Sequence, residues 1–284
     1  MNTIEIPQRN IVCEVPECWD EMTSEQVCAI VQLFECYRRG AISEVDFYVR
    51  ALYLLLGIRR RPTTIFLERV LLRKYSRRDE HVVLLCEQLL PFLVAENETG
   101  RTLTFDSVRN FLPSIRYRRR TLIGPADLLA DLTFAEFRFA CTEMSEYFSN
   151  GDRRALDRMI GCLYRPAGRG GRRRQSFDPE RLDEFARTVA RLPLWQKKII
   201  LMWFANCVSH IQNKEVRIDG RAIEFSCLFD SKEDDRESGS LGWVSVLYAL
   251  ASDGVFGDAE KTDRAGLFDV LCLLYDNYHK NRRK

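Results

Sequence analysis

The sequence lacks an excess of charge of either sign. Its 284 residues contain 43 Lys and Arg side chains against 41 Asp and Glu, which leaves a formal net charge of +2. This balance excludes a polycation that binds nucleic acid by bulk charge alone. Apolar residues make up 46% and charged residues 30% of the chain, values typical of a globular protein rather than a disordered one.

Long apolar runs are also missing. The longest, residues 51–58 and 199–208, are far shorter than the roughly 18–20 residues that span a bilayer. Residues 1–7 show no basic segment followed by an apolar one, as a secretory signal would. The sequence therefore predicts a cytoplasmic protein without a membrane segment.

Signatures of catalytic, metal or cofactor sites are scarce. Ten cysteines are scattered without a C-x-x-C pair, and the three histidines complete no zinc-binding spacing. The phosphate-binding patterns G-x-x-x-x-G-K-[S/T] and G-x-G-x-x-G are absent. We therefore expect buried cysteines, no metal, no cofactor and no catalytic residue, and hence a protein that is not an enzyme.

One pair of residues keeps a catalytic alternative open. Cys207 and His210 lie one helical turn apart, so a thiolate and an imidazolium could pair if both side chains left the same face. No third, orienting residue can be identified, and the apolar helix around the pair favours a core thiol. An enzyme centred on these two residues is the weakest of three hypotheses for this chain.

The most informative pattern present is an internal repeat. Residues 22–26 and 132–136 both form a capping box, in which a Thr hydroxyl accepts the amide three residues on and a Gln or Glu side chain returns to the Thr amide. Each box predicts the start of a helix. Behind each box, at the same offset, runs one apolar stripe with helical period: Val27, Ile30, Val31, Phe34 and Tyr37, then Phe137, Ala140, Cys141, Met144 and Tyr147.

A second amphipathic helix is expected after each of these. In both copies it leads to an Arg-Pro element, Arg61-Pro62 and Arg165-Pro166, where proline disfavours further helix. Two αα-hairpins of similar design would result. We interpret them as a duplication, with the generic resemblance of amphipathic helices as the alternative.

These patterns predict a mainly α protein, built as αα-hairpins with an internal duplication and a few short β-strands. The expected parts are a first helical half, a related second half and a C-terminal helical cap, at residues 1–115, 116–230 and 241–284. Further apolar helices are expected at 82–94 and 197–211, and short strands at 4–15, 102–105 and 115–123.

Arginine clusters suggest an anion or nucleic-acid site. The loop at residues 168–174 combines flexible glycines with several guanidinium groups, as a phosphate-binding loop would. However, the chain uses 35 Arg against 8 Lys, so Arg clusters arise easily, and no aromatic residue is interleaved in this loop to stack on bases. The candidate contacts are Arg59, Arg60, Arg61, Arg118, Arg119, Arg120, Arg169, Arg172, Arg173 and Arg174.

The four tryptophans lie near helix starts or on apolar helices, where core packing is their expected role. The alternative is that some of them line a groove for an amphipathic partner helix. The candidate partner-binding residues are Trp19, Trp195, Trp203 and Trp243.

Four phrases together resemble a known family: residues 16–26, residues 131–137, residues 163–166, and Gly242-Trp243 followed by residues 253–257. They are similar to proteins encoded in tail-gene clusters of Bacteroidetes phages and prophages, and the resemblance covers most of the chain. It implies a tail-assembly-chaperone-like protein, which holds the tape-measure protein soluble while tail-tube subunits polymerise round it. It implies no catalytic residues. The length and the repeat of this chain depart from the simplest chaperone pattern.

The leading functional hypothesis is a non-enzymatic protein-binding or assembly protein, prophage-encoded and tail-assembly-chaperone-like. It would hold a helical partner, such as a tape-measure or tail-tube protein, in an apolar groove between hairpins. The alternative is a nucleic-acid-associated phage or mobile-element protein that uses the Arg-rich loops. In that case the Arg clusters should converge on one face.

Overall fold

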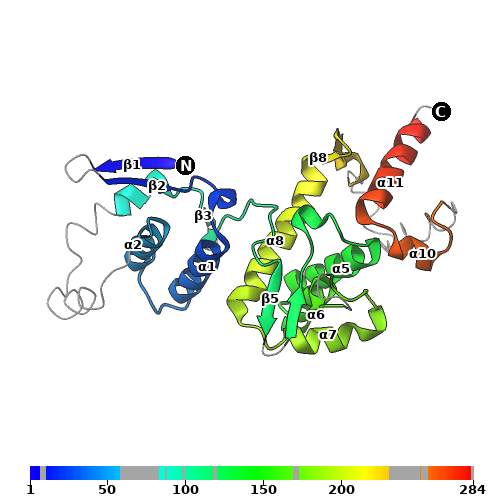
Figure 1. Ribbon diagram of the computed structural model, residues 1–284, viewed down its shortest axis with the longest axis horizontal. Coiled ribbons are helices and arrows are strands. Elements are labelled where there is room, and N and C mark those ends of the chain that lie inside the picture. Colours follow the sequence, from blue (N-terminus) through cyan, green and yellow to red (C-terminus); the bar gives the residue numbers. More distant parts are fainter. Residues whose placement is uncertain are drawn as a thin grey trace. The chain divides into compact units, whose positions relative to one another are not determined.

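The structure of the chain is a computed structural model (Figure 1). It describes residues 1–6, 11–57, 83–86, 88–97, 100–117, 120–168, 173–229, 250 and 255–282. The chain forms two units, Met1–Ser107 and Val108–Lys284. The predicted second half and C-terminal cap thus belong to one unit, while the predicted duplication stays a prediction.

The first unit begins with an antiparallel hairpin and continues into two helices. Its described elements are β1 (Asn2–Ile6), β2 (Ile11–Val15), the 3-10 turn η2 (Trp19–Glu21), α1 (Ser24–Arg38), α2 (Glu44–Leu55), β3 (Val94–Asn97) and β4 (Gly100–Leu103). Its core includes the indole of Trp19, which is 0% exposed. The expected helix at 82–94 is shorter than predicted, because the chain turns at 91–93 and β3 begins at Val94.

The second unit carries a three-stranded sheet and most of the helices. Its described elements are β5 (Ser114–Tyr117), β6 (Arg120–Ile123), η3 (Asp127–Leu129), α5 (Phe134–Asn150), α6 (Arg153–Leu163), β7 (Arg165–Pro166), η4 (Pro179–Arg181), α7 (Leu182–Val189), α8 (Leu194–Asn213), β8 (Glu215–Ile218), β9 (Arg221–Glu224), η5 (Ser226–Leu228), α10 (Ala259–Arg264) and α11 (Leu267–Arg282). Helix α6 packs against α5, α7 and α8. A Cβ atom added at Gly161 would lie 3.1 Å from the Ala186 amide nitrogen, so the absence of a side chain there lets α6 and α7 approach closely.

Both predicted capping boxes are confirmed. In the first, the Gln26 amide donates to Thr23 Oγ1 at 3.2 Å, and the Thr23 amide donates to Gln26 Oε1 at 2.8 Å. In the second, the Glu136 amide donates to Thr133 Oγ1 at 3.3 Å, and the Thr133 amide donates to Glu136 Oε2 at 2.7 Å. Each box satisfies amide donors that a helix start otherwise leaves unpaired.

The predicted apolar stripes are buried to different extents. In α1 the four residues Val27, Ile30, Val31 and Phe34 are buried. In α5 only the first two residues of the corresponding stripe are buried, Phe137 and Ala140, while the other three are partly exposed. Of the second helices, α6 buries its whole expected stripe (Leu156, Met159, Ile160 and Leu163), whereas α2 buries Val49 and Leu52 but leaves Tyr53 and Leu56 partly exposed.

The prediction of a mainly α protein is wrong. Helices account for 57% and strands for 17% of the described residues, and the strands form four small antiparallel sheets, so the fold is mixed α and β. The β8–β9 hairpin was not predicted. Its two-residue turn, Asp219-Gly220, has positive φ at both positions (49° and 79°), as a type I′ turn requires. This Asp-Gly pair is a hairpin signal that the helix-centred interpretation missed.

Among the described residues, no helix is both long and apolar enough to cross a membrane.

Candidate functional site

A groove of about 1190 Å³ lies within the second unit. One side is formed by the ends of β5 and β6 and the following loop to Asp131. The other sides come from the first turn of α5, the segment 173–179 and α10. Its lining mixes apolar side chains with five carboxylates and four guanidinium groups: Asp131, Glu136, Asp178, Glu260, Asp263, Arg165, Arg173, Arg174 and Arg264.

The register of the three-stranded sheet explains which strand residues reach the groove. Ser114 pairs with Ile123, and Ile123 pairs with Arg165, so these three side chains share one face of the sheet. All three line the groove. The opposite face carries Ile115 and Leu122, which are 3% and 1% exposed and belong to the core.

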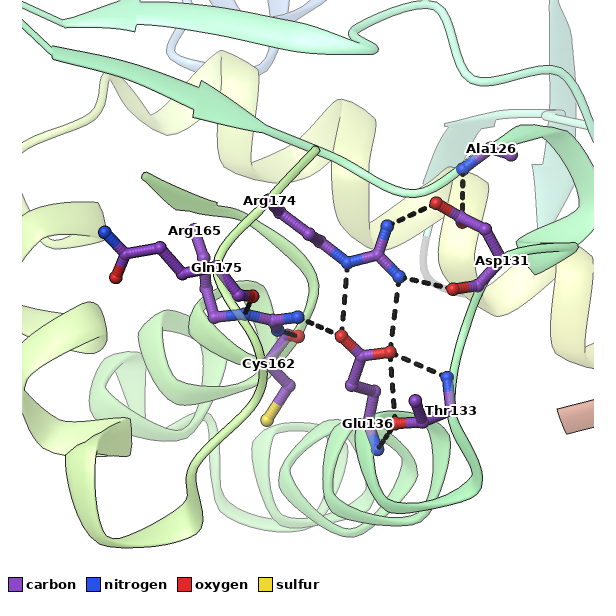
Figure 2. A network of polar contacts seen from close by, with 8 residues as sticks. All are labelled: Ala126, Asp131, Thr133, Glu136, Cys162, Arg165, Arg174 and Gln175. Carbon is purple, nitrogen blue, oxygen red and sulfur yellow. Dashed lines mark hydrogen bonds and ion pairs between the residues drawn. The ribbon is translucent and has the colours of Figure 1, made fainter. Parts of the chain in front are cut away.

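Glu136 is the centre of the polar network beside the groove (Figure 2). Its carboxylate accepts from Arg174 Nε at 3.1 Å and from Arg174 Nη2 at 3.2 Å, a bidentate pair. It also accepts a hydrogen bond from Arg165 Nη2 and the capping bond from the Thr133 amide. The side chain that completes the capping box of α5 therefore also holds two arginines of the segment 165–174.

Arg174 and Arg165 have further partners, which fix the orientation of their guanidinium groups. Arg174 Nη1 reaches Asp131 Oδ2 at 2.5 Å, and its Nη2 donates to the Asp131 carbonyl at 2.7 Å. Arg165 donates to the carbonyl oxygens of Cys162 and Gln175 (Figure 2). Arg174 thus makes four hydrogen bonds and Arg165 three within the chain, which limits what either arginine can offer to a ligand.

Burial determines the electrostatics of this network. The side chains of Glu136, Arg165 and Arg174 are 3%, 1% and 8% exposed. Burial alone would raise the pKa of Glu136, but the charge of Arg165 and the hydrogen bonds and charge of Arg174 outweigh it, so the pKa is lowered. The carboxylate is therefore ionised at neutral pH, and its charge compensates the buried guanidinium groups.

The backbone of the glycine–arginine loop closes against the same sheet. The Gly168 amide donates to the Arg173 carbonyl at 2.8 Å, and the Gln175 amide donates to the Pro166 carbonyl at 3.0 Å. Ala167 and Arg174 form an isolated antiparallel bridge. The segment 173–175 is therefore held in two ways. Its backbone is bonded to the β7 region, and the Arg174 side chain pairs with Glu136 of α5.

Aromatic side chains support the network from the groove side. The Arg165 guanidinium lies over the Phe177 ring at 5.4 Å, and Phe177 packs against Phe139 at 5.4 Å between ring centroids. Arg138 lies over Phe139 at 4.6 Å and pairs with Asp263 of the α10 region at 2.8 Å. The walls of the groove are thus connected through α5.

The predicted arginine site is only partly available. Arg174 was expected to contact an anion or nucleic acid, but its side chain is only 8% exposed and is paired with Glu136 and Asp131. Arg120 and Arg173 are exposed. The remaining candidates lie outside the described residues: Arg59, Arg60, Arg61, Arg118, Arg119, Arg169 and Arg172.

Two of the predicted partner-binding tryptophans are core residues. Trp19 is 0% and Trp203 is 1% exposed, and each indole N–H donates to a backbone carbonyl, of Phe92 and Val108 respectively. They offer no surface to a partner, because packing and hydrogen bonding are complete inside the protein. Trp195 is partly exposed and does not line the groove, and Trp243 lies outside the described residues.

Cys207 and His210 do not form an activated pair. The Cys207 thiol is buried and faces the Val108 carbonyl at 3.7 Å. Burial raises the pKa of Cys207, whereas burial and the nearby Lys214 lower the pKa of His210. A thiolate–imidazolium pair would need the opposite shifts. Both groups are therefore neutral at neutral pH.

The cysteines are less uniformly buried than predicted. None of the ten, all of which lie in the described ranges, forms a disulfide; Cys86, Cys162 and Cys207 are buried, Cys36 is exposed, and the others are partly exposed. Within the described ranges, no three His, Cys, Asp or Glu side chains are grouped so as to hold a metal ion.

Sequence reasoning missed the central role of Glu136 and the burial of Arg165. The capping box identified Glu136 only as a helix-starting residue, and the Arg-Pro element identified Arg165 only as a helix end. The sequence did contain one signal. Asp131 and Glu136 are two acidic residues near a helix start, and a buried arginine needs an acidic partner of this kind.

No family model, curated protein or solved structure matches the chain.

Proposed function

We propose that this chain is a non-enzymatic protein-binding protein whose second unit receives a segment of its partner in the groove. The observation that carries this proposal is the combination of an open groove with charges that are already matched inside the chain. Glu136 compensates Arg165 and Arg174, Arg264 pairs with Glu260 at 2.5 Å, and Asp263 pairs with Arg138.

Matched charges favour a polypeptide over a nucleic acid as the ligand. A nucleic-acid site needs several guanidinium or ammonium groups free to neutralise phosphates. The groove instead presents five carboxylates beside four guanidinium groups, and its arginines Arg165 and Arg174 are engaged with carboxylates and carbonyls. Nucleic-acid association remains the second hypothesis only for arginines outside the groove.

The chemistry of the lining also suggests what enters. The lining includes apolar residues such as Ile123, Ala135 and Phe177 as well as polar ones, so it is not the purely apolar groove expected for a helical partner. A segment that carries both apolar and polar side chains would fit this lining. Apolar contacts would supply affinity, and the fixed charges would select the register.

The resemblance to phage tail-cluster proteins supplies a candidate partner and setting. We propose a prophage-encoded, tail-assembly-chaperone-like role in the cytoplasm, in which the partner is a tape-measure or tail-tube protein. A tape-measure protein is a long chain with exposed apolar stripes, and a groove that covers one of its segments would reduce self-association.

Co-expression tests this proposal. The full chain is expressed with the tape-measure protein from the same gene cluster, and the soluble fraction and co-purification of that partner are measured. We expect both to increase relative to expression of the partner alone. Replacing Ala126, an exposed groove residue, by Trp should abolish the increase by filling the groove.

Ala130→Trp is the matched control, because Ala130 is also exposed, lies four residues away and does not line the groove. It should behave like the wild-type chain. Unchanged partner solubility together with no co-purification would refute the proposal, as would equal loss in both variants.

A further inference from the structure

The groove's sheet has an open edge at β5. The strand order is β5-β6-β7, so within the described ranges β5 is paired on one side only. The Gly124 amide donates to the Pro113 carbonyl at 2.9 Å, which makes these residues a hydrogen-bonded pair of the antiparallel ladder. Because such pairs alternate with non-hydrogen-bonded ones, the register places Ser114 and Arg116 at non-hydrogen-bonded positions opposite β6. Their backbone N–H and C=O groups therefore point away from β6, toward the open side of β5.

The opposite side of the sheet agrees with this alternation. Thr121 is the residue opposite Arg116, and its carbonyl accepts from the Ala167 amide at 3.2 Å, on the β7 side. In the part of the chain that the structure describes, no backbone hydrogen bond reaches the outward groups of Ser114 or Arg116. The edge can therefore accept another strand.

Position and charge distinguish this edge from others in the unit. Ser114 lines the groove, and Arg116 is exposed on the same face of β5. Among the described residues Arg116 has no ion-pair partner, and its cross-strand neighbour Thr121 is uncharged. The outward positions of β5 thus combine unpaired backbone groups with a positive charge.

The β8–β9 hairpin has a similar edge, but this edge has no uncompensated positive charge and does not lie at the groove. Arg217 lies opposite Ala222, two residues before a two-residue turn, just as Arg116 lies two residues before the connection to β6. Its neighbour at the next outward position is Glu215, so the charge of that edge is balanced, and neither residue lines the groove.

We propose that an extended, acidic segment of the partner protein adds to β5 as a further strand, with its backbone paired to Ser114 and Arg116 and a carboxylate on the Arg116 guanidinium. This inference rests on the proposed function and specifies how the partner is held. The occupant is a polypeptide because only a peptide backbone matches alternating N–H and C=O groups at strand spacing. It is acidic because the edge carries an uncompensated positive charge.

A peptide-binding measurement tests the strand addition. The probe is a fluorescently labelled eight-residue peptide of alternating Glu and Val, measured by fluorescence anisotropy with the full chain. Arg116→Glu reverses the charge, and Arg116→Pro also removes the outward N–H without a ladder bond to β6. We expect each variant to weaken binding about tenfold or more. A peptide of alternating Lys and Val should bind at least about tenfold more weakly than the acidic probe.

Arg217→Glu and Arg217→Pro are the matched controls, and circular dichroism checks that all four variants keep the fold. The controls should bind the acidic probe as the wild-type chain does. The inference is overturned if the probe does not bind, if the Arg217 variants weaken it equally, or if the Lys peptide binds as well. Tighter binding of a single-stranded oligonucleotide that is lost in Arg116→Glu would assign the edge to nucleic acid instead.

This test separates the inference from the function on which it rests. If the co-expressed partner is held, Ala126→Trp releases it and the Arg116 variants do not, then the groove binds protein but β5 does not accept a strand. If neither variant nor the wild-type chain affects the partner, the proposed function itself fails.

Discussion

At the scale of single residues, Glu136 has two roles that normally belong to different side chains. It completes the capping box of α5 and it compensates two buried guanidinium groups. Removing one partner of a buried ion pair leaves the others uncompensated in a medium that solvates charge poorly. The network is therefore best tested by changing the charge of Glu136 while keeping its shape.

Glu136→Gln should lower the free energy of unfolding by about 3–5 kcal/mol, because Arg165 and Arg174 lose their shared counter-charge. Urea-induced unfolding followed by circular dichroism measures this change. Glu260→Gln is the control, since the Glu260–Arg264 pair is exposed, and it should unfold like the wild-type chain. Equal effects of the two substitutions would show that the network does not stabilise the fold.

The same carboxylate predicts a pH dependence. Its pKa is lowered by folding, so its contribution to stability is fully present above its ordinary pKa of 4.5 and is lost as the pH falls through the folded-state value. The difference in unfolding free energy between wild-type and Glu136→Gln chains should therefore begin to shrink as the pH falls below 4.5. A difference that stays constant from pH 7 to pH 3 would contradict the assigned ionisation.

At the scale of helices and strands, the two capping boxes differ in what surrounds them. In the first box Gln26 also donates to the Leu55 carbonyl at 3.4 Å, whereas in the second box the Glu136 carboxylate is held by two arginines. The capping box of α5 is therefore part of a buried ionic network, and the cap and the network should be energetically coupled.

A double-mutant cycle measures that coupling. Thr133→Ala should lower the unfolding free energy by about 0.5–2 kcal/mol, the usual cost of a lost cap. Combined with Glu136→Gln, its effect should be non-additive, because both substitutions disturb one network. Thr23→Ala is the matched control, and its effect should add to that of Glu136→Gln. Additivity in both cycles would show that the second cap works independently.

Several helices and strands could be predicted from the sequence, and others could not. Helix starts at Thr23 and Thr133 follow from local chemistry, so they could be predicted, and the segments around β1–β2, β4 and β5–β6 were placed correctly as strands. The β8–β9 hairpin was missed although its Asp-Gly turn was visible, because its strands directly follow the long apolar helix α8.

The candidate site could be predicted less well, because its partners are distant in sequence. Arg174 pairs with the carboxylates of Glu136 and Asp131, which lie about 40 residues earlier in the sequence. No local pattern distinguishes it from Arg173, which is exposed in the same loop. The burial of Trp19 and Trp203, by contrast, followed the general preference of indoles for the core.

At the scale of the whole molecule, function would be concentrated in the second unit. That unit contains the groove, the Glu136 network and the open edge of β5, all within Val108–Lys284. The near-balance of charge over the whole chain is repeated in the groove, where carboxylates and guanidinium groups nearly cancel. Binding through such a surface should depend on shape and register more than on ionic strength.

Amide hydrogen exchange of the full chain, with and without the co-expressed partner, tests the central claim most directly. If the partner enters the groove, the exposed amides of residues 114–126 and 173–179 should exchange more slowly in the complex, while those of the β8–β9 hairpin at 215–224 should be unchanged. Protection at 215–224 without protection at 114–126 and 173–179, or no change anywhere in a complex that demonstrably forms, would contradict the account.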